Sequence, residues 1–74
     1  MDRAMIQRHL AEAEGHIRQG KALIAKQREI LNRLEKVGAD PSVALKMLEN
    51  LEAAQAMHVT DRERIAAELA AAEK

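Results

Sequence analysis

Three histidines are the residues of this 74-residue chain whose type and spacing most suggest a chemical site. His9, Glu12 and His16 are separated by three and four residues, a spacing that places side chains on one face of a helix. Imidazole and carboxylate groups are suitable ligands for zinc, iron or nickel. If His58 approaches His16 from the second half of the chain, the four residues could bind a metal or respond to pH near neutrality.

A structural interpretation of the same histidines is the stronger one. The sequence contains no His-Glu-x-x-His motif, and no Glu-x-x-His pair recurs on two helices as it does in di-iron bundles. We therefore interpret His9, His16 and His58 as amphipathic residues that flank or enter a core. The prediction is that the protein has no metal and no cofactor, with the histidine cluster as a metal- or pH-sensing alternative.

The composition argues against catalysis. The chain has no Cys, which excludes thiol enzymes, disulfide scaffolds and cysteine-based zinc sites. Ser42 and Thr60 carry the only aliphatic hydroxyl groups, and neither has a base and an orienting acid at a recognisable spacing. No glycine-rich phosphate loop is present. We expect a protein that is not an enzyme.

The composition argues against nucleic acid as a partner. Lys plus Arg and Asp plus Glu each total 12, so the formal net charge is zero, and there are no aromatic residues to stack on bases. The basic outer surface of the first half could still contact phosphates, which keeps a small nucleic-acid accessory protein as an alternative. A solvated helix face explains this surface better. Its residues are Arg18, Lys21, Arg28, Arg33 and Lys36.

Membrane insertion and secretion are not predicted either. No apolar run approaches the roughly 20 residues that a membrane span needs. The segment Met1 to Leu10 is charged and lacks the continuous apolar stretch of a signal peptide. The expected location is the cytoplasm.

The segment from Gly38 to Pro41 divides the chain into two helices. Gly38 suits the left-handed residue after a helix C-terminus, Asp40 is a good N-cap, and Pro41 is favoured at the first helical position. We predict one all-α domain, residues 1–74, with helices over about 3–37 and 41–72, a turn at 38–40, and Asp2 as the first N-cap. Two breaks would change this: one between Gly15 and Gly20, and one at the capping-box sequence that begins at Thr60.

Apolar residues recur every seven positions in both helices and form stripes wider than a coiled-coil seam. A three-residue turn makes the helices antiparallel neighbours. With equal rise in both helices, positions whose numbers sum to 78 or 79 should face each other, so that Gly20 faces His58. Gln27 and Gln55 should lie within about a turn of each other and fix the register.

A single seam without aromatic residues is not expected to bury enough apolar surface. The wide stripes indicate a homodimer that forms an antiparallel four-helix bundle, or a hairpin that binds an unidentified protein. Residues 1–38 carry a net charge of +3 and residues 39–74 one of −3, which favours their pairing. We expect a non-enzymatic interaction or scaffold module, with regulation as one role. The predicted association residues are Leu10, Ile17, Ile24, Leu31, Leu48, Leu51, Ile65 and Leu69.

A set of short motifs spans nearly the whole chain. They are His16-Ile17, Gly20, Ile24-Ala25, Gln27-Arg28, Leu34, Gly38-Ala39-Asp40, Ala44, Leu48, Gln55-Ala56, His58 and Asp61-Arg62. In these the sequence resembles a group of short helical proteins from alphaproteobacteria. The resemblance implies a bacterial source. It implies no function.

Overall fold

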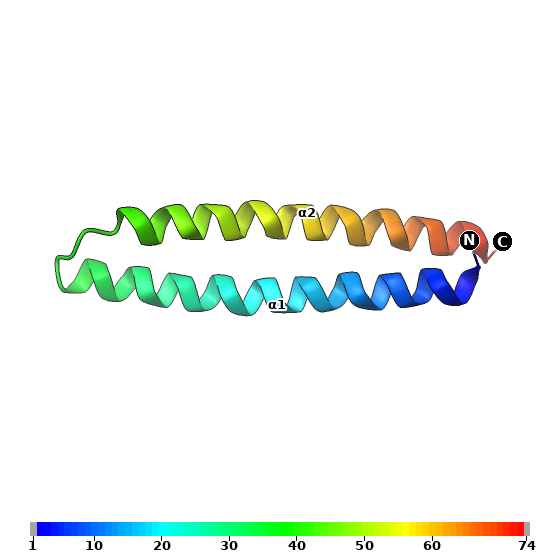
Figure 1. Ribbon diagram of the computed structural model, residues 1–74, viewed down its shortest axis with the longest axis horizontal. Coiled ribbons are helices and arrows are strands. Elements are labelled where there is room, and N and C mark those ends of the chain that lie inside the picture. Colours follow the sequence, from blue (N-terminus) through cyan, green and yellow to red (C-terminus); the bar gives the residue numbers. More distant parts are fainter. Residues whose placement is uncertain (1, 74) are drawn as a thin grey trace.

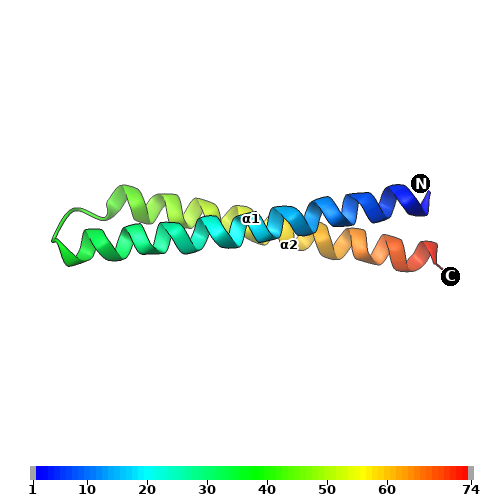
Figure 2. The ribbon, with the colours of Figure 1, turned by 90° about the horizontal axis from the view of Figure 1, so that it is seen from below.

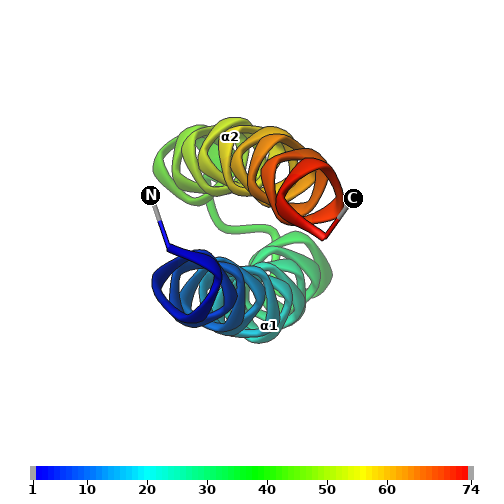
Figure 3. The same cartoon turned by 90° about the vertical axis from the view of Figure 1, so that its right-hand side faces the viewer.

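The computed structural model describes residues 2–73 and contains two helices, α1 (Arg3–Lys36) and α2 (Ser42–Ala72). The helices run antiparallel and lie side by side along their whole length (Figures 1 and 2). The hairpin measures 57 × 14 × 13 Å. Viewed end-on, it is a single pair of helices with no further layer (Figure 3). The predicted all-α hairpin is confirmed.

The ends of α1 are capped as the sequence predicts. The carboxylate of Asp2 accepts a hydrogen bond of 3.0 Å from the backbone N–H of Met5, which identifies Asp2 as the N-cap. At the other end, Val37 is the C-cap and Gly38 has φ of 73°. A residue with a side chain would be strained at this angle, so the glycine is needed for the chain to leave the helix.

The start of α2 differs from the prediction by one residue. Pro41 is the N-cap and Ser42 the first helical residue, where the sequence predicted Asp40 and Pro41. The Asp40 carboxylate nevertheless accepts hydrogen bonds from the Ser42 hydroxyl (2.6 Å) and from its backbone N–H (3.0 Å). These two bonds hold the pKa of Asp40 below its ordinary value of 3.8.

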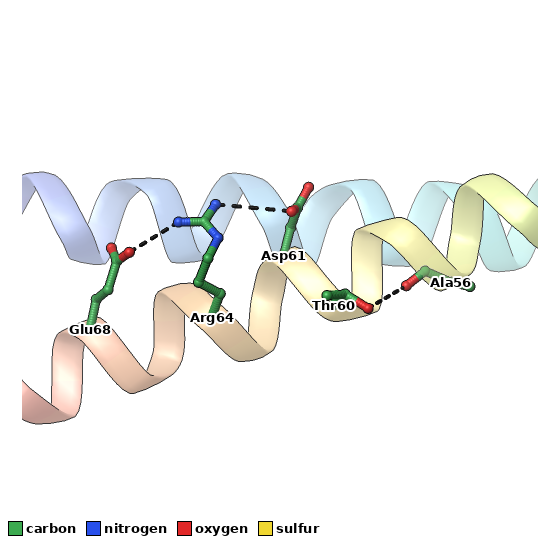
Figure 4. Close-up of polar contacts among 5 residues, drawn as sticks. All are labelled: Ala56, Thr60, Asp61, Arg64 and Glu68. Atoms are coloured by element: carbon green, nitrogen blue, oxygen red, sulfur yellow. Dashed lines mark hydrogen bonds and ion pairs between the residues drawn. The ribbon is translucent and has the colours of Figure 1, made fainter.

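Both helices are continuous, so neither of the two breaks occurs. The capping box that begins at Thr60 does not start a new helix. Instead the Thr60 hydroxyl donates a hydrogen bond of 3.1 Å to the carbonyl of Ala56, one turn back in α2 (Figure 4). This bond satisfies the hydroxyl within the helix.

The core is a narrow seam between the helices. Among the described residues, the buried apolar side chains are Ile6 and Ala13 from α1 and Ala44 and Leu48 from α2. None of these is completely shielded from solvent, and most other apolar residues are half-buried or exposed. Over the same residues, neither helix is long and apolar enough to cross a membrane.

The register of the seam corrects the predicted one. Gly20 lies against Gln55, His16 against His58, and Arg3 forms an ion pair of 3.2 Å with Glu73. Facing positions therefore sum to about 75, and the prediction that Gly20 faces His58 is wrong. The cause is the connection, which runs back along the hairpin before α2 begins (Figure 1). Non-helical chain can advance about 3.3 Å per residue against 1.5 Å in a helix, so equal rise does not apply there.

The two seam glutamines act separately, which corrects a second expectation. The side-chain amide of Gln27, itself 7% exposed, donates to the carbonyl of Ala44 at 3.0 Å. The amide of Gln55 donates to the carbonyl of Ile17 at 2.9 Å. Because Ile17 and Gln27 are ten residues apart in α1, the two hydrogen bonds lie about 15 Å apart rather than within one turn. Each glutamine ties the helices together at its own level.

Candidate functional site

One side of the seam carries the histidines. The ring centroids of His16 and His58 are 5.4 Å apart, with the rings tilted by 42°. The two side chains come from different helices, so the predicted approach of His58 to His16 is confirmed. They line an open pocket of about 190 Å³ near the ends of the chain. The other lining residues are His9, Glu12, Ala13, Asp61, Arg64 and Ile65.

The pocket brings together all four candidate metal ligands: His9, Glu12, His16 and His58. Over residues 2–73, however, no three or more His, Cys, Asp or Glu side chains are arranged to hold a metal ion. The close contact is therefore a pair of imidazoles with charged neighbours. Two like groups at this distance would repel each other if both became protonated.

Charged groups from α2 border the histidine pair. Arg64 forms an ion pair of 3.0 Å with Glu68 and a longer one of 3.9 Å with Asp61 (Figure 4). These side chains are largely exposed, and such pairs contribute at most about 1 kcal/mol. Asp61 and Arg64 were not among the predicted site residues. The signal that could have found them is their spacing of three and six residues from His58, which places them on neighbouring turns of one helix.

The opposite side of the seam is lined by cations. Lys21, Arg28 and Arg62 border a groove of about 450 Å³, whose remaining lining is Ile17, Ile24, Ala25, Gln55 and Val59. We call this the cationic groove. Arg28 crosses it to form an ion pair of 3.1 Å with Glu52 of α2. The long stems of these side chains can cover the aliphatic residues beneath them while their charges stay in water.

Gly20 lies directly against the side chain of Gln55 from the other helix. A Cβ atom placed on Gly20 would overlap the Oε1 atom of Gln55. The same oxygen is buried and accepts no hydrogen bond from the described residues. Gly20 therefore gives Gln55 the space to reach the carbonyl of Ile17. Gly15 has no such contact, since a Cβ there would meet only the end of the Arg18 side chain at 3.7 Å.

The predicted association residues divide among three places. Leu48 is 8% exposed and lies inside the seam, so it is not available to a partner. Ile17 and Ile24 line the cationic groove, and Ile65 lines the histidine pocket. All seven residues other than Leu48 are half-buried. The remaining four are placed by their heptad spacing from these residues: Leu10, Leu31 and Leu69 lie towards the groove, and Leu51 lies towards the histidines.

Three exposed large apolar residues outside the predicted association set, Leu23, Val37 and Met47, lie on the histidine side of the seam. Leu23 (50% exposed), Ile30 and Val37 follow His9 and His16 at intervals of seven along α1. On α2, Met47 (52% exposed) precedes Asp61 by fourteen residues, and Leu51 precedes His58 by seven. They continue the histidine side towards the turn. We call this set the apolar patch: Leu23, Ile30, Val37, Met47 and Leu51.

The predicted basic surface is not one patch. Lys21 and Arg28 border the cationic groove, whereas Arg33 lies with Ile30 and Val37 beside the apolar patch. These positions are on different sides of α1. The basic residues are therefore spread around the helix.

Comparison of the chain with protein-family models, with curated proteins and with solved structures found no match.

Proposed function

We propose that this protein is a non-enzymatic interaction module whose hairpins associate in pairs to form a four-helix bundle. The observation that carries the proposal is the surface area. The hairpin exposes 5542 Å². A folded monomer of this mass, 8.2 kDa, would expose about 4,500 Å². Each chain therefore exposes about 1,000 Å² more surface than a compact monomer of its size.

This surplus matches the size of a protein interface. A standard interface buries about 800 Å² on each partner. The apolar patch offers the side chains for such an interface, because Leu23 and Met47 are each about half exposed. A second copy of the chain is the occupant that we propose. It carries the same patch, and a two-fold symmetric contact would cover both patches at once.

The oligomeric state tests this function. Analytical ultracentrifugation at neutral pH should give the mass of a dimer, with dissociation on dilution. The Leu23→Glu variant should weaken the dimer by 100-fold or more, about 3 kcal/mol, because a carboxylate would be buried in the interface. Leu45→Glu is the matched control. Leu45 is 44% exposed, but it precedes Val59 by fourteen residues and so lies on the side of the cationic groove. The Leu45→Glu variant should therefore still form the dimer.

A wild-type mass that stays monomeric at high micromolar concentration would contradict the proposal. Equal weakening by both substitutions would also contradict it, because the effect would then reflect damage to the hairpin. Circular dichroism distinguishes loss of the interface from damage to the hairpin. The hairpin is almost entirely helical, so a damaged variant would lose helical signal.

A pH-responsive form of the same function is favoured by the contact of His16 with His58. Histidine changes charge between pH 5 and 8. In the pocket, His9 and Arg64 would oppose added positive charge, while Glu12 and Asp61 would offset it. With two imidazoles in contact, we expect the dimer to be weaker at pH 5 than at pH 8 and the His58→Gln variant to lose most of this difference. A wild-type dissociation constant that is equal at both pH values would contradict this form of the function.

A further inference from the structure

We infer that the two hairpins of the proposed dimer lie with their turns at the same end, apolar patch against apolar patch. The inference rests on the proposed self-association and specifies its geometry. It comes from one feature of the histidine side: its chemistry changes along the length of the hairpin.

The half of this side nearest the turn is mainly aliphatic, with Arg33 beside Ile30 and Val37 at its edge. In the observed register Leu23 lies at the level of Leu51, and Ile30 lies close to the level of Met47. The half nearest the chain ends is polar. There His16 contacts His58, and Glu12 and Asp61 line the same pocket. The boundary lies near the middle of the hairpin, between His16 and Leu23.

An opposite-end arrangement with full overlap would set unlike halves against each other. It would bring Glu12 and Asp61 of the second copy to the level of Leu23 and Ile30 of the first. Moving a carboxylate out of water and against aliphatic side chains is costly. A shifted opposite-end arrangement avoids this, but it overlaps only the turn-proximal halves and leaves much of the extra surface exposed.

The same-end arrangement avoids both penalties. Aliphatic side chains meet aliphatic side chains near the turn, and polar pockets meet near the chain ends. In such a bundle α1 of one copy lies antiparallel to α2 of the other, as it does to its own α2. Because facing positions sum to about 75, Glu12 of one copy then lies within a residue of the level of Arg64 of the other. These opposite charges complement each other.

Distances between spin labels test this geometry, and the absence of native Cys makes single labels unambiguous. Two variants are prepared, Ala39→Cys in the turn and Ala4→Cys near the start of α1. Both positions are exposed. In the same-end dimer both pairs of labels should be separated by less than about 30 Å, since neighbouring helix axes in a bundle are about 8–10 Å apart.

An Ala4 label pair separated by about 45 Å or more would overturn the inference, because both opposite-end arrangements place these positions far apart. It would leave the proposed dimer intact. If neither label pair is coupled and the mass is that of a monomer, the proposed function itself fails.

A second variant establishes which face is used. Adding Leu23→Glu to each labelled chain should abolish the short distances, while adding Leu45→Glu should leave them unchanged. Short distances that survive Leu23→Glu in a folded dimer would show that a different face is buried, and would overturn the inference.

Discussion

The two sides of the seam differ in how they cover their aliphatic residues. In the cationic groove, long charged side chains border Ile17, Ile24 and Val59, and the ion pair of Arg28 with Glu52 joins the helices above them. On the other side, Leu23 and Met47 remain half exposed. The groove side can therefore be solvated as it stands, whereas the apolar patch gains by being covered. This difference is what makes one side the candidate interface.

The largest expected effect on stability comes from shortening a side chain buried in the seam, between the cationic groove and the apolar patch. Leu48→Ala would open a cavity in the seam, where Leu48 is 8% exposed, and should destabilise the hairpin by about 2–5 kcal/mol. Met57→Ala, at a residue that is 69% exposed, should change stability by less than about 0.5 kcal/mol. Urea denaturation of both variants measures the difference. Similar losses from the two substitutions would contradict the seam as described.

The two glycines of α1 test the contact between Gly20 and Gln55 in the seam, because only Gly20 lies against the other helix. Gly15→Ala should stabilise the protein by up to about 1 kcal/mol, because alanine favours the helix and its Cβ meets little. Gly20→Ala should be less stable than Gly15→Ala by about 1–2 kcal/mol, because Gln55 must move and lose its hydrogen bond to Ile17. Thermal unfolding measures both. The double variant Gly20→Ala/Gln55→Ala should recover part of the loss, and equal stability of the two glycine variants would contradict the tight contact.

The ion pair over the cationic groove should matter less. Arg28 and Glu52 are about half exposed, so Glu52→Gln should cost less than about 1 kcal/mol, and the cost should shrink at high salt. The dissociation constant of the proposed dimer should not change, because the groove lies away from the apolar patch. A tenfold weakening of the dimer would place the interface on the groove side instead.

The smallest expected effect is at the turn. The hydrogen bonds from Ser42 lower the pKa of Asp40, so this carboxylate stabilises the folded state above about pH 3.8. That contribution is lost as the pH falls through the lowered folded value. Asp40→Asn should therefore flatten the stability profile below pH 4 and leave its shape near pH 7 unchanged. An NMR titration in which the Asp40 carboxyl titrates at or above 3.8 would contradict this.

The local sequence predicted most of the fold. The stop at Gly38, the cap at Asp2 and the seven-residue apolar period indicated two long helices joined by a short turn. These signals act over one or two turns of chain, so they can be read without knowing the partner helix. The meeting of His16 and His58 was also predictable, because two heptad grids and a short connection bring them near each other.

Only the tertiary structure decided the register and the division of the apolar stripe. The axial length of the non-helical connection set which residues face each other, and no local pattern encodes that length. The apolar stripe on α1 is wide enough that several different sets of residues, each spaced by seven, could have packed against α2. In the structure the residues that α1 buries are Ile6, Ala13 and Gln27, and Gly20, at the same seven-residue spacing, lies against Gln55. That choice left Leu23 and Met47 in the open, because a single neighbouring helix can cover only the centre of so wide a stripe.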